Sequence, residues 1–199
     1  MDFFVIEDSM LWINLELQII KKNNIFKPQN LIRILTHFSR QHEGTNDLYD
    51  QIEHGYMSGK FQDLKLSQKI TLGYNYYQVH TGSKAFFSKF AEEIYQNISE
   101  NVSTYDLLRI LQIYSEISKD FVKMFVLIEE MLISRFEQLS KDEICVAVCA
   151  FAMSGYGTPY LYKVFEAALK SETSNLTVQQ TKEVARGFIF SLKGSKQFL

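Results

Sequence analysis

Hydrophobic and aromatic positions return along this chain at a nearly fixed interval of 37 or 38 residues. One apolar row consists of Phe26, Leu64, Val102, Leu139 and Leu176. A second row, twelve residues further on in each interval, is aromatic throughout: Phe38, Tyr76, Tyr114, Phe151 and Phe188. Self-similarity with a period of this length predicts a helical-repeat protein, in which each unit is one supersecondary element.

The second half of each interval repeats in the same way. Its rows are Leu48, Phe86, Met124 and Leu161, then Tyr49, Phe87, Phe125 and Tyr162, then Ile52, Phe90, Ile128 and Phe165. Within one unit these positions follow the spacing i, i+1, i+4, which places them on one side of a helix. The sequence therefore predicts two helices per unit, which we call the first and the second helix.

Local signals mark where the helices begin and end. Ser140 with Glu143 and Thr177 with Gln180 have capping-box spacing, and Ser103 with Asp106 is a shorter-armed relative. Pro28 suits the first position of a helix. Glycines, which favour the left-handed turns that end helices, stand at the junctions: Gly44, Gly82, Gly155 and Gly157.

These patterns predict an all-α solenoid and a single repeat domain over residues 1–199. Residues 1–25 are expected to form an N-terminal cap. This cap contains one amphipathic helix over about residues 7 to 24, with Leu11, Leu15 and Ile19 on its apolar face. Residues 26–199 form about five helix-pair units. Lys193-Gly194-Ser195 falls at the turn inside the fifth unit, so we expect that unit to be incomplete and to leave an apolar face open around Phe188 to Leu199 as a partner contact.

The composition favours a folded helical protein and counts against a general nucleic-acid binder and a membrane-spanning protein. The chain is 46% hydrophobic and 22% charged, and it has two Pro and nine Gly, which suits long helices around a core. A net charge of −2 counts against a general nucleic-acid binder, which usually carries an excess of Lys and Arg. The acidic N-terminus resembles neither a secretory signal nor a presequence, and no apolar stretch approaches the roughly 20 residues of a membrane span. We expect a protein that is soluble or peripheral to a membrane.

Catalytic and metal-binding chemistry has little support in the sequence. Cys145 and Cys149 are four residues apart inside an apolar run, which predicts small core residues rather than metal or redox ligands. His37, His42, His54 and His80 form no pair with metal-ligand spacing. The sequence thus predicts no catalytic, cofactor-binding or metal-binding residue, no cofactor and no enzyme activity.

Two surface features bear on nucleic-acid binding. Bases could stack on Tyr74 and Tyr77 beside Lys65, Lys69 and Lys84, although Tyr76 between them belongs to the aromatic core row. The carboxylate pairs Glu92-Glu93 and Glu129-Glu130 are expected to form a solvated ridge, which would repel a phosphate backbone.

The string from Phe151 to Tyr162, FAMSGYGTPYLY, resembles the octotricopeptide-type, pentatricopeptide-like repeat in its aromatic-Ala, Gly-Tyr and Pro-x-Leu-aromatic positions. The period agrees, whereas the other units keep the apolar rows and lose this signature. The resemblance implies an organellar helical-repeat protein, of a kind that either handles RNA or serves as a structural subunit of mitochondrial assemblies. Only five of the 21 basic residues are Arg, which is similar to proteins of AT-rich protist genomes with lineage-specific mitochondrial subunits.

The function expected from these observations is a non-catalytic scaffold subunit of a larger mitochondrial assembly, such as ATP synthase or a respiratory-chain complex, that contacts other protein subunits. The alternative is an organellar RNA-binding repeat protein or a mitoribosomal component. The mitochondrial location comes from the resemblance, and a cytoplasmic adaptor is the alternative location.

Overall fold

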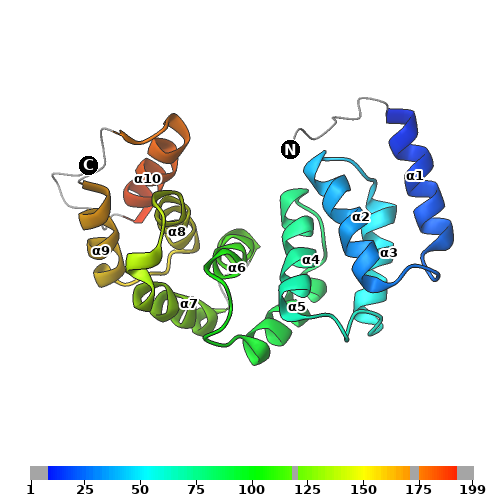
Figure 1. The fold of residues 1–199 in the computed structure, drawn as a ribbon, viewed down its shortest axis with the longest axis horizontal. Helices are drawn as coiled ribbons and strands as arrows, with labels where there is room; N and C mark the ends of the chain where they lie inside the picture. Colours follow the sequence, from blue (N-terminus) through cyan, green and yellow to red (C-terminus); the bar gives the residue numbers. More distant parts are fainter. Residues whose placement is uncertain (1–8, 118–120, 171–174, 192–199) are drawn as a thin grey trace. The chain divides into compact units, whose positions relative to one another are not determined.

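In a computed structural model of the protein, the described residues are 9–117, 121–170 and 175–191. Within these ranges the chain forms α-helices and one 3-10 helix, and no strand. The prediction of an all-α helical-repeat protein is confirmed. The chain divides into two compact units, Met1–Ile98 and Ser99–Leu199, so the single continuous domain stays a prediction (Figure 1).

The helices follow the predicted order. The N-terminal unit contains α1 Ser9–Lys22, α2 Pro28–Arg40, α3 Asn46–Met57, α4 Leu66–Gln78 and α5 Lys84–Asn97. The C-terminal unit contains α6 Thr104–Ile117, α7 Val122–Ser134, η1 Phe136–Gln138, α8 Lys141–Ser154, α9 Pro159–Lys170 and α10 Val178–Ser191. The first helices are α2, α4, α6, α8 and α10, and the second helices are α3, α5, α7 and α9. Successive first helices pack on one another, α2 on α4, α6 on α8, and α8 on α10 (Figure 1).

Inside each compact unit, one aromatic contact recurs where a second helix meets the first helix of the next repeat. In the N-terminal unit the Tyr49 and Tyr76 ring centroids lie 5.4 Å apart. In the C-terminal unit the Tyr162 and Phe188 centroids lie 6.0 Å apart, and both rings are buried. Edge-to-face pairs at this distance add to the free energy gained from burying the rings. The aromatic rows of the sequence therefore form the core that joins successive repeats inside each unit.

The predicted helix starts are confirmed. Ser140 and Glu143 form a reciprocal capping box at α8. Thr177 Oγ accepts a hydrogen bond from Gln180 N at 3.2 Å, and Ser103 Oγ accepts one from Asp106 N at 3.1 Å. The junction glycines Gly44, Gly82, Gly155 and Gly157 all have positive φ. At Gly82 a Cβ would lie 2.8 Å from the Phe87 ring, so both the backbone angle and the space require glycine there.

Three glutamates, of which Glu16 and Glu129 are buried and Glu53 is half-buried, connect successive second helices. Glu129 on α7 accepts hydrogen bonds from the backbone N–H of Thr158, at 3.1 and 3.2 Å, and from its hydroxyl, at the start of α9. Glu16 on α1 receives the same two donors from Thr45 at the start of α3, and Glu53 on α3 receives them from Ser83 at the start of α5. Each carboxylate thereby satisfies a backbone donor that a helix start leaves open.

This arrangement corrects the expected solvated ridge. Glu92 and Glu130 are exposed, as expected, but Glu129 is only 7% exposed. Glu93 is half-buried, where it accepts a hydrogen bond from the Tyr56 hydroxyl at 2.9 Å and pairs with Lys69 at 2.7 Å. One carboxylate of each pair therefore belongs to the contacts between helices rather than to a solvated surface.

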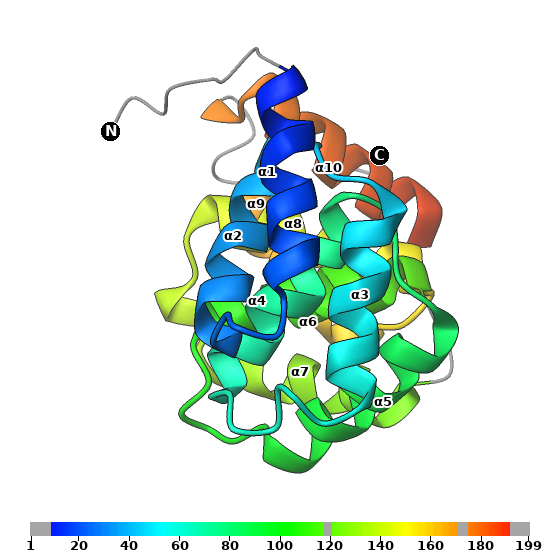
Figure 2. The same ribbon diagram turned by 90° about the vertical axis from the view of Figure 1, so that its right-hand side faces the viewer.

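The N-terminal cap helix is present, but its buried face differs from the predicted one. Trp12, Glu16 and Ile19 are buried, and Trp12 packs edge-on against Phe38 of α2 with 4.8 Å between centroids. Leu11 and Leu15 are exposed. Helix α1 thus occupies the place of a second helix beside α2 and α3 (Figure 2). Trp12 stands 37 residues before Tyr49 and so belongs to the same aromatic row.

Candidate interaction surface

The outer side of α10 exposes positions that are buried in every other first helix. Lys182 belongs to the row of Ile32, Ile70, Leu108 and Cys145, all of which are buried. Ala185 belongs to the row of Leu35, Gly73, Leu111 and Val148, which are also buried. The α10 outer face, as we call it, consists of Lys182, Ala185, Arg186, Ile189 and Phe190.

Contacts in another repeat indicate which helix packs on the row that includes Ala185. A Cβ on Gly73 of α4 would lie 2.4 Å from the Phe90 ring of α5, so the row that includes Ala185 faces the second helix of the same repeat. The opposite side of α10 is fixed. A Cβ on Gly187 would lie 2.2 Å from Val148 Cγ1 of α8 and 3.1 Å from the Val148 backbone. Helix α10, which carries the outer face, is therefore packed closely against α8 on its opposite side.

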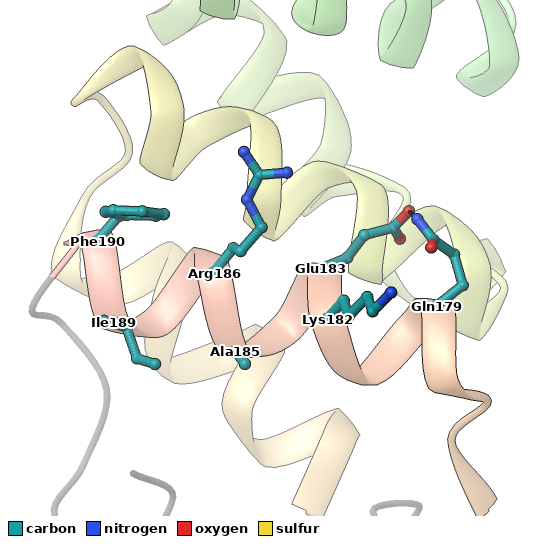
Figure 3. A pocket seen from close by; sticks show the side chains of 7 residues that line it. All are labelled: Gln179, Lys182, Glu183, Ala185, Arg186, Ile189 and Phe190. Carbon is teal, nitrogen blue, oxygen red and sulfur yellow. Dashed lines mark hydrogen bonds between the residues drawn. The ribbon is translucent and has the colours of Figure 1, made fainter.

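The α10 outer face borders a surface pocket of about 400 Å³ with a polar and an apolar end (Figure 3). Gln179, whose Nε2 donates to Glu183 Oε1 at 2.9 Å, lies at the polar end. Ile189 and Phe190 form the apolar end and are 56% and 65% exposed. Exposed apolar side chains beside cations are typical of a protein contact surface.

The structure changes the prediction of an apolar C-terminal face around Phe188 to Leu199. Phe188 is buried, and residues 192–199 lie outside the described residues. The exposed face begins earlier, at Lys182, and it mixes cations with apolar groups.

The tyrosine and lysine group predicted as a base-stacking surface is engaged in the fold only in part, since Lys65 and Lys84 are exposed. Tyr76 is buried, and its hydroxyl donates to the Tyr49 carbonyl at 2.6 Å. Tyr74 and Tyr77 are half-buried, with 5.6 Å between their ring centroids. The charge of Lys69 is paired with Glu93. This surface therefore offers less to a nucleic acid than the sequence indicated.

Two of the four histidines, His42 and His80, have a backbone role. His42 and His80 occupy the same repeat position at the ends of α2 and α4, with φ values of 54° and 51°. In the helix pair α8 and α9 that position is Gly155, with φ 78°. Sequence reasoning considered these histidines only as ligands and missed the left-handed turn, although the shared register with Gly155 indicated it.

In the part of the chain that the structure describes, no group of three His, Cys, Asp or Glu side chains is placed to hold a metal ion. The Cys145 thiol is buried, and the Cys149 thiol, which is half-buried, lies 3.9 Å from the Met153 sulfur. Burial raises the pKa of Cys145 to about 11 and also raises the pKa of Cys149.

We expect both thiols to react slowly with iodoacetamide at about pH 8, since the raised pKa values keep them protonated and the thiolate is the nucleophile. Cys145 should be the slower of the two because it is fully buried. Mass spectrometry of alkylated peptides from native and urea-unfolded protein measures both rates. Equal rates for Cys145 in the two states would contradict this account.

Comparisons with known proteins assign no family. No protein-family model matches the chain, and no curated protein is similar to it in sequence. The octotricopeptide-type resemblance therefore stays a prediction. Among the helices that the structure describes, none is both long enough and apolar enough to cross a bilayer.

Proposed function

We propose that this protein is a non-catalytic scaffold subunit that joins other proteins within a larger assembly. The observation that carries the proposal is the α10 outer face, where Lys182 and Ala185 are exposed in rows that are buried in the four preceding first helices. In a helical repeat, each such face is stabilised by the next helix that packs on it. A partner subunit would supply that helix.

The location and the type of assembly rest on resemblance. The octotricopeptide-like string between Phe151 and Tyr162 favours a mitochondrial assembly, such as ATP synthase or a respiratory-chain complex. The RNA-binding alternative is weakened by the pairing of Lys69 with Glu93.

We expect Ile189→Glu to remove partners that co-purify with the tagged protein, because it places a charge in the apolar end of the α10 outer face. Val126→Glu is the matched control, since Val126 is an exposed apolar residue on α7. Quantitative mass spectrometry of purifications from the native cells measures the loss. Stoichiometric partners that both variants retain equally would contradict the role of this face.

A further inference from the structure

The turn between α1 and α2 exposes a large apolar side chain among lysines. Ile25 is 80% exposed. Lys21 and Lys22 before it and Lys27 after it are exposed as well. Residues 17–42 contain no Asp or Glu, so no carboxylate of this segment balances these charges. The turn is therefore strongly basic, although the net charge of the whole chain is −2.

The turn between α3 and α4 adds to this basic surface. Lys60 Nζ donates to the carbonyl oxygen of Asn23 at 2.6 Å and to its side-chain oxygen at 3.0 Å, which joins the two turns. Lys65 at the end of the second turn is exposed, and Asp63 is the one carboxylate in residues 58–65. The exposed side chains of both turns form a surface that we call the lysine edge: Lys21, Lys22, Ile25, Lys27 and Lys65.

The repeat does not require an apolar residue at the position of Ile25. The equivalent residues before the other four first helices are all polar: Asp63, Asn101, Gln138 and Asn175. A side chain that is 80% exposed also gains little from burial within the chain. Ile25 is thus a departure from the repeat pattern that the fold itself does not explain.

Two of the lysines stand where the fold favours another residue. Lys27 and Lys65 are the N-cap residues of α2 and α4, and a lysine has no acceptor for the backbone N–H groups of a helix start. A cation is also unfavourable at the positive end of a helix. The equivalents before α6, α8 and α10 are capping hydroxyls: Ser103, Ser140 and Thr177. The N-terminal unit therefore keeps two cations at a cost in local stability.

We propose that the lysine edge docks on an anionic lipid surface, with Ile25 inserted between the headgroups and the lysines placed beside the lipid phosphates. Lysines close to a membrane surface are attracted by anionic lipids. An apolar side chain adds to this attraction when it enters the boundary between headgroups and acyl chains. The proposal goes beyond the scaffold function, since it needs no protein partner.

The chemistry of the lysine edge favours lipid over RNA, which also carries phosphates. Non-specific binding of single-stranded RNA uses aromatic rings on which bases stack. In the two turns Phe61 is buried and Phe26 is half-buried, so neither ring is exposed as a stacking platform. An exposed isoleucine, by contrast, is stabilised by acyl chains.

Co-sedimentation of the full chain with vesicles tests the proposal. One set of vesicles is phosphatidylcholine, and the other is an equimolar mixture with phosphatidylglycerol. The chain should bind the mixed vesicles roughly tenfold or more strongly. Raising NaCl from about 0.1 M to about 1 M should release it, because the Debye length falls from about 10 Å to about 3 Å. Equal binding to both sets, or binding to neither, would overturn the proposal.

Lys27→Ser separates membrane binding from folding. The serine restores the kind of cap found at Ser103 and Ser140, so the variant should unfold at the same or a higher urea concentration than the parent. Its affinity for the mixed vesicles should fall roughly fivefold, and further when Lys65→Ser is added. Lys163→Ser, at an exposed lysine of α9, is the control and should bind as the parent does. Equal effects of Lys27→Ser and Lys163→Ser would show that the edge is not the contact.

Ile25→Asn tests the insertion. Asparagine stands at the equivalent positions Asn101 and Asn175, so the fold should accept it. The affinity for the mixed vesicles should fall roughly tenfold, as expected for loss of a buried isoleucine side chain. Val126→Gln, at an exposed valine of α7, should leave binding unchanged. If Ile25→Asn binds like the parent, no insertion takes place and the proposal is wrong.

Fluorescence anisotropy with single-stranded oligouridylate examines the other polyanion. Oligouridylate that binds more tightly than the mixed vesicles, and that is weakened by Lys27→Ser but not by Ile25→Asn, would identify RNA as the occupant and overturn the proposal. All of these measurements use the purified chain with lipid or oligonucleotide alone. Their failure would therefore leave the scaffold function, which Ile189→Glu tests, unaffected.

Discussion

Replacing Phe165 by alanine is expected to lower the free energy of unfolding by about 3–5 kcal/mol, as for other fully buried phenylalanines. Phe165 has no exposed surface, and its ring stacks on Phe136 with 6.0 Å between centroids. Truncation would leave a cavity between helices that the close packing of this unit cannot easily fill. Urea unfolding followed by circular dichroism measures the change.

The control for this experiment is Lys163→Ala on the same helix. Lys163 is exposed, so its truncation should change the free energy of unfolding by less than about 0.5 kcal/mol. If both variants unfold at the same urea concentration as the parent protein, Phe165 is not a core residue and the repeat register is wrong.

Replacing Glu129 by alanine is the second large change, with an expected loss of about 1–3 kcal/mol. The variant would leave the Thr158 N–H without its acceptor at a partly buried helix start, while the Thr158 hydroxyl would keep its contact with Leu161 N at 3.2 Å. Glu129→Gln should lose less, because the amide oxygen can still accept one hydrogen bond.

Glu130→Ala tests whether the effect comes from the hydrogen bonds or from the loss of a charge. Glu130 is the exposed neighbour of Glu129 and should be nearly neutral when replaced. Equal urea midpoints for the Glu129 and Glu130 variants would indicate that both carboxylates face solvent, as first predicted. They would exclude the role of Glu129 in connecting α7 to α9.

The repeat could be predicted because its strongest signals are hydrophobic and local. A ring such as Phe151 must be buried in any stable arrangement of these helices, and the cap at Ser140 depends on residues three positions away. These two kinds of signal are enough to place the helices and the core rows.

The role of Glu129 could not be predicted from its own neighbourhood, since a carboxylate beside another carboxylate normally faces water. Its burial depends on Thr158, 29 residues later. The same spacing relates Glu16 to Thr45, and Glu53 to Ser83 is one residue longer, so this signal was present in the sequence. Ala91 stands at the glutamate position of α5. The next second helix in the sequence, α7, has Phe121 as its N-cap residue and no side-chain cap.

The surfaces were the least predictable part. Helix α1 has apolar residues on most of its circumference, so the sequence alone could not show that Trp12 faces inward and Leu15 outward. On α10, the exposed Lys182 differs from the apolar residue or Cys at the same position in the other first helices. Only the comparison with the buried equivalents in the other first helices indicates that Lys182 stands at an interface position.

The most direct test of the central claim is native purification of the tagged protein with and without nuclease, followed by mass spectrometry. The account predicts a stoichiometric set of partner proteins that survives nuclease and decreases with Ile189→Glu. Partners that disappear with nuclease, or that are ribosomal proteins and organellar transcripts, would contradict the scaffold function and favour RNA binding.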